Sequence, residues 1–204
     1  MKDYMRGCCK DKRYANRGQS LEQFIRFAND QYKRDGIAVV TKIPTEFLPI
    51  RNAYGQVVSC KVVEKSSVDF IGRVGSMPLA GEAKETKQDN IRFDAVQDHQ
   101  AAFLDAYEGE NEAICVVVVA FNLKTFYVVP WRFWKAGREA WKQAQSYGKR
   151  TADKITIEYN GETWTTTGKA SVKESELLDE WRVDTGGRYG LDYLRRYIKS
   201  GTMA

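Results

Sequence analysis

The segment from Ser66 to Lys84, SSVDFIGRVGSMPLAGEAK, constrains the fold of this chain more than any other. Its central pair Gly75-Ser76 fits a two-residue hairpin turn, since a type II′ turn favours glycine at the first of its two central positions. This turn would fix the register of the flanking strands and place Asp69 directly opposite Glu82. Because side chains alternate between the faces of a strand, one face would be polar and the other apolar. The polar face would hold Ser67, Asp69, Glu82 and Lys84, and the apolar face Val68, Phe70, Leu79 and Ala83.

Two facing carboxylates and a nearby amine are the components of a metal-dependent phosphodiesterase site. Like charges directly opposite one another destabilise a sheet, and a bound divalent cation is an economical reason for placing Asp69 and Glu82 in this way. Mg²⁺ prefers oxygen ligands, so we predict that both carboxylates bind it and that Lys84 holds the attacking water or offsets negative charge. The alternative is a surface salt-bridge cluster without a catalytic role. The apolar opposite face favours the catalytic interpretation.

Two predicted helices flank this hairpin. Ser20 is a good N-cap, and the apolar residues that follow it recur at helical spacing, which predicts a helix over residues 20–34. On the flank of its apolar stripe, Glu22 could supply a third carboxylate; an exposed, uninvolved glutamate is the alternative. A second helix is predicted over residues 95–108, with Gln100 on its apolar face. A polar side chain there needs a hydrogen-bond partner, which either the site or a backbone edge could supply.

The remaining pattern predicts a mixed sheet with helices packed on it. Residues 45–65 leave this sheet as a two-stranded projection, a structure that is marginally stable unless it packs on something. The other predicted elements are strands over 37–43, 114–121 and 124–129, a helix over 131–147, a hairpin around Asn160-Gly161, and short helical segments over 172–181 and 189–199. We therefore expect an α/β fold in a single domain over residues 16–204, with the C-terminal hairpin and helices over 155–199.

Composition restricts the possible functions. The chain has 204 residues, of which 43% are hydrophobic and 29% charged, as is usual for a soluble globular protein. Its longest apolar run, Ala113 to Phe121, is too short to span a membrane and its start has no signal-peptide pattern, so we expect a cytoplasmic protein. The single histidine, His99, leaves a histidine-based zinc hydrolase without ligands. Nucleotide-binding glycine motifs are absent from the sequence, and the four cysteines show no CxxC spacing, which favours free thiols.

The net charge of +5 is concentrated near the start of the chain. Six basic and two acidic residues among positions 1–17 give that segment a charge of +4. We expect residues 1–15 to form a flexible basic arm, and such arms commonly bind nucleic-acid phosphates in a salt-dependent way. The alternative is a solvated tail that only aids solubility.

Taken together, these motifs resemble the RecU family of Holliday-junction resolvases from Gram-positive bacteria and their phages, within the PD-(D/E)xK nuclease superfamily. The resemblance covers most of the chain from Asn16 onward. It rests on NRG at Asn16 to Gly18 followed by Glu22, GIAVVTKIPT ending at Thr45, SSVDFIG, GEAKETK from Gly81 to Lys87, DHQ at Asp98 to Gln100 and, more weakly, LDYLRRYI near the C-terminus.

The resemblance implies a restriction-endonuclease-like nuclease fold with a protruding two-stranded stalk, formed here by about residues 45–65. It implies a homodimer that uses Mg²⁺ or Mn²⁺ to nick symmetric strands of a four-way DNA junction during recombination and repair, with recombination or branch-migration proteins as possible partners. The implied catalytic residues are Asp69, Glu82, Lys84, Glu22 and Gln100, of which the three carboxylates would bind the metal. The implied DNA-binding residues are Arg17, Lys42 and Lys87.

Two departures from the family pattern concern the shape of the stalk and the preferred junction. Glu46 stands where a second proline is expected after Pro44-Thr45, and the C-terminal segment matches only loosely. Two alternatives to junction resolution therefore stay open. One is a nuclease of the same fold that cuts other DNA structures, and the other is a DNA-binding or strand-annealing protein that does not cut.

Overall fold

The structure is a computed structural model that describes residues 20–64, 66–109, 112–146 and 154–200. The predicted basic arm, Arg17 and the NRG sequence lie outside the described residues, as does nearly all of the charged stretch after the predicted helix over 131–147. No helix in the described part of the chain is long and apolar enough to cross a membrane.

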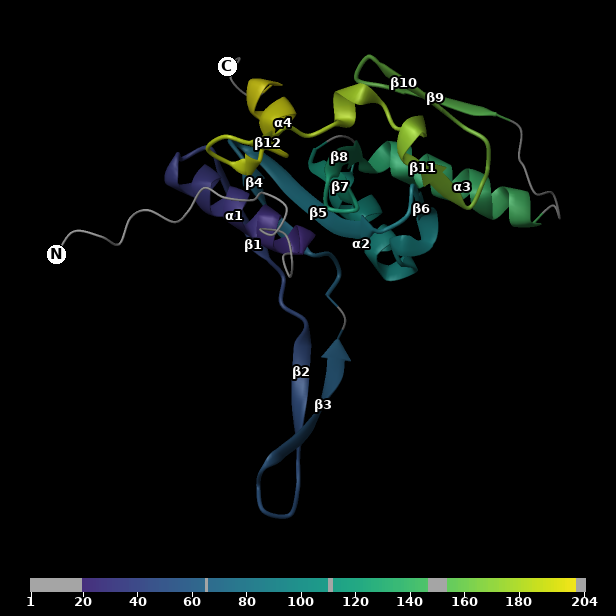
Figure 1. Cartoon of the computed structure of the whole chain (residues 1–204). Helices are drawn as coiled ribbons and strands as arrows, with labels where there is room; N and C mark the ends of the chain where they lie inside the picture. The colour runs from purple at the N-terminus through teal and green to yellow at the C-terminus, as the bar shows by residue number, and fades with distance from the viewer. Residues whose placement is uncertain (1–19, 65, 110–111, 147–153, 201–204) are drawn as a thin grey trace.

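A five-stranded mixed sheet forms the centre of the fold (Figure 1). Its strand order is β1-β4-β5-β7-β8, and β5 and β7 are parallel while the other neighbours are antiparallel. The strands are β1 (Ala38–Lys42), β4 (Phe70–Val74), β5 (Met77–Thr86), β7 (Ile114–Phe121) and β8 (Thr125–Pro130). The predicted α/β class with a mixed central sheet is confirmed.

Helices cover both faces of this sheet (Figure 1). The helices are α1 (Leu21–Arg34), α2 (Asp98–Glu108), α3 (Trp131–Ser146) and the short α4 (Arg195–Ser200). Strand β7 contributes to both cores, since Val116 and Val118 pack in the cluster that contains α1, whereas Val117 and Val119 pack with residues of α2 and α3. A strand buried on both faces reads as a continuous apolar run, which explains the sequence ICVVVVAF.

A second hairpin projects away from this body (Figure 1). It consists of β2 (Glu46–Arg51) and β3 (Val57–Glu64), which pair antiparallel as a separate two-stranded sheet. The predicted two-stranded projection over about 45–65 is therefore present. We call it the projecting hairpin, and we call β4–β5 the catalytic hairpin after its predicted role.

The C-terminal third adds small two-stranded sheets to the body. The hairpin around Asn160-Gly161 is confirmed: both residues have positive φ, 51° and 78°, as a type I′ turn requires. Its strands are β9 (Ile155–Tyr159) and β10 (Glu162–Thr166); the other short pairs are β6 (Asn90–Arg92) with β11 (Ser171–Lys173) and β12 (Thr185–Gly186) with β13 (Gly190–Leu191).

Three helix predictions need correction. Residues 172–181 form the end of β11 and two 3₁₀ turns, Glu174–Glu176 and Asp179–Trp181, because β11 pairs with β6 and Trp181 is buried in the core. In 189–199, only the part from Arg195 is helical, and it continues to Ser200. The helix predicted from residue 95 begins at Asp98, after a 3₁₀ turn over Phe93–Ala95. Tertiary packing has overridden local helix propensity at these places.

Candidate active site

The catalytic hairpin has the register that its turn predicts. Val74 pairs with Met77 and Phe70 pairs with Gly81, and Gly75 has a φ of 57°. Continuing this register one step brings Asp69 beside Glu82. The backbone N–H of Asp69 donates a hydrogen bond to Oε2 of Glu82 at 3.1 Å. The predicted proximity of the two carboxylates is therefore confirmed.

Close packing under the hairpin holds the two strands in place. The ring of Phe70, which is buried, lies against Gly81, and a Cβ atom added at Gly81 would overlap that ring. The backbone N–H of Ala83 donates to Oδ2 of Asp69 at 2.8 Å, which fixes the carboxylate against β5. The position of Asp69 thus depends on main-chain contacts as well as on its own strand.

Glu82 is the buried centre of the site, with an exposed fraction of only 1%. Its Oε1 accepts a hydrogen bond from Nε2 of Gln100 at 2.5 Å and lies 2.7 Å from Nζ of Lys84. Gln100 also accepts, through Oε1, the backbone N–H of Gln97 at 2.9 Å, the residue that caps α2. Both partners considered for Gln100, the site and a backbone group, are therefore present.

The surroundings of Glu82 change its protonation. The pKa of its carboxyl group is raised to about 7: burial is the largest cause, the charge of Asp69 adds to it, and Lys84 opposes both effects. A carboxyl group with a pKa near 7 loses its charge readily in the metal-free protein. A divalent cation beside Asp69 and Glu82 would favour the ionised form of both, so this donor pair suits a hard cation such as Mg²⁺.

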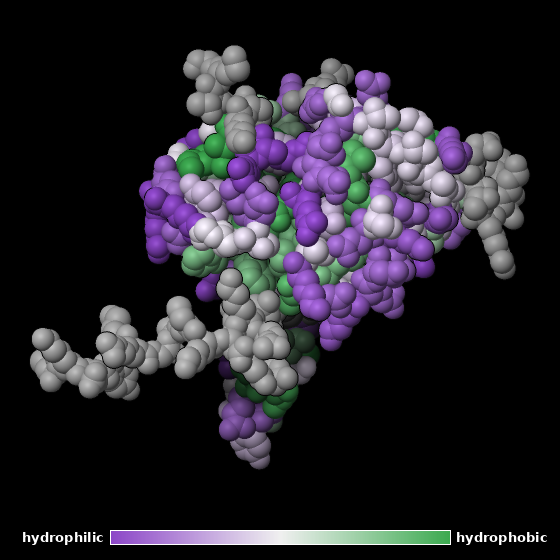
Figure 2. Space-filling view, turned by 45° about the horizontal axis from the view of Figure 1, so that its top comes forward, coloured by the Kyte–Doolittle hydropathy of each residue, from purple (hydrophilic) through white to green (hydrophobic). Residues whose placement is uncertain are grey.

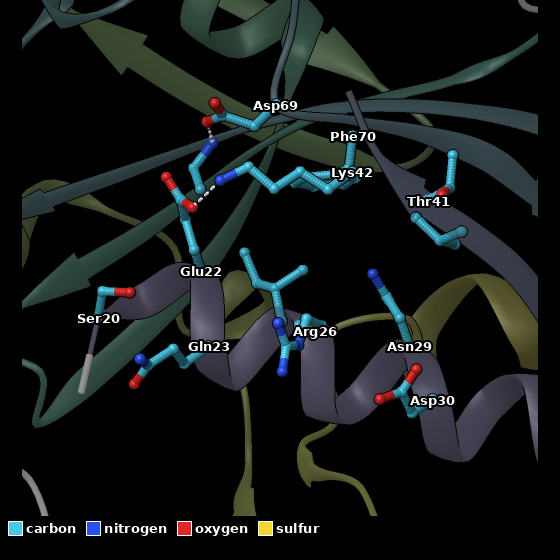
Figure 3. Close-up of a pocket in the computed structure, with 13 residues that line it drawn as sticks. Ser20, Glu22, Gln23, Arg26, Asn29, Asp30, Thr41, Lys42, Asp69 and Phe70 are labelled. Atoms are coloured by element: carbon cyan, nitrogen blue, oxygen red, sulfur yellow. Dashed lines mark hydrogen bonds and ion pairs between the residues drawn. The ribbon is translucent and has the colours of Figure 1, made fainter. Parts of the chain in front are cut away.

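A groove of about 450 Å³ between α1 and β1 leads to this site, and Glu22, Lys42 and Asp69 contribute to its lining (Figure 3). In the groove, the carboxylate of Glu22 forms an ion pair with Lys42, and both side chains are exposed. Among the described residues, no group of three acidic, histidine or cysteine side chains could hold one metal ion. Metal binding by Asp69 and Glu82, with Glu22 as a third ligand, therefore stays a prediction.

The predicted DNA-binding residues lie in different places. Lys42 is at the end of β1 beside Glu22, and Lys87 is exposed just beyond the end of β5. Arg17 lies outside the described residues. Their contacts with DNA stay predictions.

Sequence reasoning missed Glu85, the residue after Lys84. Its Oε2 accepts the backbone N–H of Leu21 at 3.2 Å, at the start of the helix that carries Glu22. Ser20, the expected cap, makes no capping hydrogen bond with its side chain. This contact joins residues 64 positions apart, so local sequence patterns contained no signal for it.

Comparison with known families decides how this arrangement is classified. The model of the family described as Recombination protein U (RecU) matches residues 16–180, which include the catalytic hairpin, both flanking helices and the projecting hairpin. The chain belongs to the RecU family. The resemblance inferred from the motifs is thereby confirmed.

Several relatives carry the name Holliday junction resolvase RecU. The protein of Streptococcus pneumoniae strain Hungary19A-6 is 34% identical over 117 residues, which cover 54% of this chain and 59% of that protein. The protein of Streptococcus oralis is 32% identical over 126 residues, covering 58% and 63%. The protein of Streptococcus uberis is 33% identical over 129 residues, covering 57% and 61%. The matched region therefore spans about three-fifths of the length of these relatives.

Proposed function

We propose that the protein is a metal-dependent DNA endonuclease that resolves four-way junctions in recombination and repair. One observation carries this proposal: the buried carboxylate of Glu82 lies beside Asp69 and contacts both Lys84 and Gln100. Membership of the RecU family, whose members compared above are named Holliday junction resolvases, supports the choice of a branched DNA substrate.

Asp69 and Glu82 would hold the metal ion, Mg²⁺ or Mn²⁺, with Glu22 as a further ligand across the groove. When bound, such an ion polarises a phosphoryl oxygen and lowers the pKa of a coordinated water molecule. Two carboxylates, with water and phosphate oxygens completing the coordination, are a usual ligand set for Mg²⁺.

The protein side chains have separate tasks in this proposal. Lys84, which is partly exposed next to Glu82, offsets the negative charge that develops on the phosphate and orients the attacking water. Gln100 holds the carboxylate of Glu82 and accepts a hydrogen bond from Lys84 at 3.4 Å. The amide of Gln100 therefore keeps the carboxylate of Glu82 and the amine of Lys84 in one orientation before the substrate binds.

DNA binding would involve both the body and the projecting hairpin. We assign phosphate contacts to Lys42 and Lys87 on the body and to Arg17 in the basic arm. The projecting hairpin carries two basic residues, Arg51 and Lys61, between the two glutamates at its ends, Glu46 and Glu64. Figure 2 shows hydrophobic surface beside hydrophilic surface on the visible part of this hairpin, below the body. Its exposed large hydrophobic side chains are Leu48, Ile50, Tyr54, Val57 and Val58. Exposed apolar and aromatic side chains next to two basic residues suit contact with the opened centre of a junction.

Paired nicking requires two active sites, so we propose that the protein acts as a homodimer on cytoplasmic DNA, and that recombination or branch-migration proteins are its partners. Each protomer would cut one of two symmetric strands. Sedimentation of the protein bound to a junction tests this arrangement, because a single protomer per junction would contradict it.

The proposed function is tested by cleavage of a mobile four-way junction and of a linear duplex with the same sequences, in Mg²⁺. We expect cleavage of the junction, little cleavage of the duplex, and loss of both in Asp69→Asn. Equal cleavage of the two substrates would instead indicate a nuclease of broader specificity. Junction binding with no cleavage in any divalent metal would indicate a DNA-binding or annealing protein.

A further inference from the structure

An ion pair outside the candidate site joins the helix that carries Gln100 to α3. A terminal nitrogen of Arg138 donates to Oδ1 of Asp98 at 2.6 Å, and Lys142 donates to the same oxygen at 2.9 Å. Arg138 is buried, with an exposed fraction of 8%, whereas the side chain of Asp98 is 83% exposed. A buried guanidinium is costly without a charged partner, so Arg138 depends on Asp98.

Tight packing places Arg138 at this position. The preceding residue, Gly137, lies against the ring of Phe93, and a Cβ atom added at Gly137 would overlap that ring. One turn earlier, Nε1 of Trp134 donates to the backbone oxygen of Phe93 at 3.3 Å. The helix α3 therefore packs against the 3₁₀ turn that leads into α2. From this position Arg138 reaches Asp98, the first residue of α2.

The first turn of α2 links Asp98 to the catalytic hairpin. Asp98 is the first residue of α2, and two residues later Gln100 bonds back to the N–H of Gln97 and forward to Glu82. Hydrogen bonds from Arg138 and then Lys142 lower the pKa of Asp98 to about 2, so its carboxylate keeps its charge near neutral pH. The contacts thus run from Arg138 through Asp98 and the turn to Gln100 and Glu82.

We propose that Arg138 is a positioning residue: through Asp98 it fixes the first turn of α2, so that Gln100 holds Glu82 and Lys84 in the arrangement needed for phosphodiester hydrolysis. This inference rests on the proposed nuclease function. It also explains why the DHQ sequence contains an aspartate that does not reach the site. Removing partners that orient a metal ligand from outside its coordination shell commonly reduces metal affinity or activity by about 10- to 100-fold.

The same two helices provide a matched control. Lys135 of α3 forms an ion pair of 2.9 Å with Asp105 of α2, about two helical turns after Asp98. Lys135→Gln removes an ion pair of the same type between the same helices, but far from Gln100. If these ion pairs only held the helices together, any loss of kcat would follow the loss of thermal stability in both variants, although Lys135 is more exposed than Arg138.

Cleavage kinetics form the first arm of the test. Arg138→Gln and Asp98→Asn should each lower kcat for junction cleavage by about tenfold, with KM and metal-free junction affinity within twofold of wild type. Arg138→Lys should restore most of the loss, and Lys135→Gln should leave kcat unchanged. In a Gln100→Ala background, Arg138→Gln should cost nothing further, because both substitutions act on the same contact. An additive loss, or an equal loss in Lys135→Gln, would overturn the proposal.

Amide hydrogen exchange forms the second arm, and it does not depend on activity. In Arg138→Gln and in Asp98→Asn, exchange should accelerate in peptides covering residues 97–101 and stay unchanged in peptides of β7. If the protein cuts no DNA but this exchange pattern is found, the nuclease proposal fails while the positioning contact stands. Unchanged exchange in residues 97–101 of both variants would overturn the positioning role itself.

Discussion

The projecting and catalytic hairpins follow one another directly in the chain, yet their surroundings differ completely. The catalytic hairpin pairs in one continuous register and lies between β1 and β7 in the central sheet. The projecting hairpin has register shifts after Glu46 and after Ile50, and in the described part of the chain it pairs with no further strand. Two similar local structures thus receive very different tertiary support.

The two hairpins differ in how far their side chains are buried. In β5, Leu79 and Ala80 are completely buried, and the same strand buries the carboxylate of Glu82. In the projecting hairpin, Tyr54 is 89% exposed at the tip. Packing therefore fixes the geometry of the catalytic hairpin closely enough to place two carboxylates together, whereas the projecting hairpin leaves its large apolar side chains exposed.

The sharpest contrast between the hairpins should appear on replacing one acid in each. Asp69→Asn should reduce junction cleavage by about a thousandfold, because it removes one of the two facing carboxylates while leaving the strand register intact. Glu46→Gln, in the projecting hairpin, is the matched control and should cleave within twofold of wild type. Initial rates at saturating Mg²⁺ measure both effects. Activity in Asp69→Asn close to that of wild type would remove the distinction between the hairpins.

The difference in stability between Glu82→Gln and the wild-type protein should depend on pH, because Glu82 of the catalytic hairpin is buried. Since the pKa of Glu82 is raised to about 7 in the folded protein, its protonated form stabilises the fold at low pH, and this contribution is lost as the pH rises through 7. Without metal, Glu82→Gln should therefore gain stability relative to wild type between pH 5 and pH 8, by at most about 3 kcal/mol. Urea unfolding in EDTA measures the difference. A stability difference that stays constant with pH would contradict the prediction. Adding Mg²⁺ should make the stability difference between Glu82→Gln and the wild-type protein smaller.

Adding one methyl group to each hairpin should destabilise the protein to different extents, because the two hairpins are packed differently. Gly81→Ala should destabilise the protein by about 2 kcal/mol, because the new Cβ overlaps the buried Phe70 ring. Gly55→Ala in the projecting hairpin meets no atom within 4 Å, and its φ of 78° strains only the loop, so the loss of global stability should be smaller. Denaturant midpoints compare the two variants. Equal losses would mean that the projecting hairpin unfolds together with the core.

The smallest expected effect concerns the tip of the projecting hairpin. The tip loop is ordered by Asn52, whose Oδ1 accepts the N–H groups of Tyr54 and Gln56, each at 3.0 Å. If the exposed ring stacks on DNA bases, Tyr54→Ser should weaken junction binding by about fivefold while Tyr54→Phe preserves it, since stacking on an aromatic ring contributes about 1–3 kcal/mol per base. Thermal stability should not change in either variant. Equal affinity of Tyr54→Ser and wild type would assign DNA contact to other parts of the molecule.

Sequence patterns predicted the parts of the molecule that local chemistry determines. The Gly75-Ser76 turn determined the register that brings Asp69 to Glu82, and the Asn160-Gly161 turn determined a second hairpin. The contact of Glu85 with Leu21 and the link from Arg138 to Asp98 were not predictable, because each joins elements far apart in the chain. The same reason accounts for the error over residues 172–181, where pairing with β6 and burial of Trp181 outweigh helical periodicity.

We propose, above all, that the catalytic hairpin builds a metal site from Asp69 and Glu82. Anomalous diffraction near the manganese absorption edge, from crystals soaked in Mn²⁺, tests this claim most directly. We predict an anomalous peak within coordination distance of both carboxylates in the wild-type protein and its loss in Asp69→Asn. Manganese bound elsewhere, with no peak at these carboxylates, would contradict it.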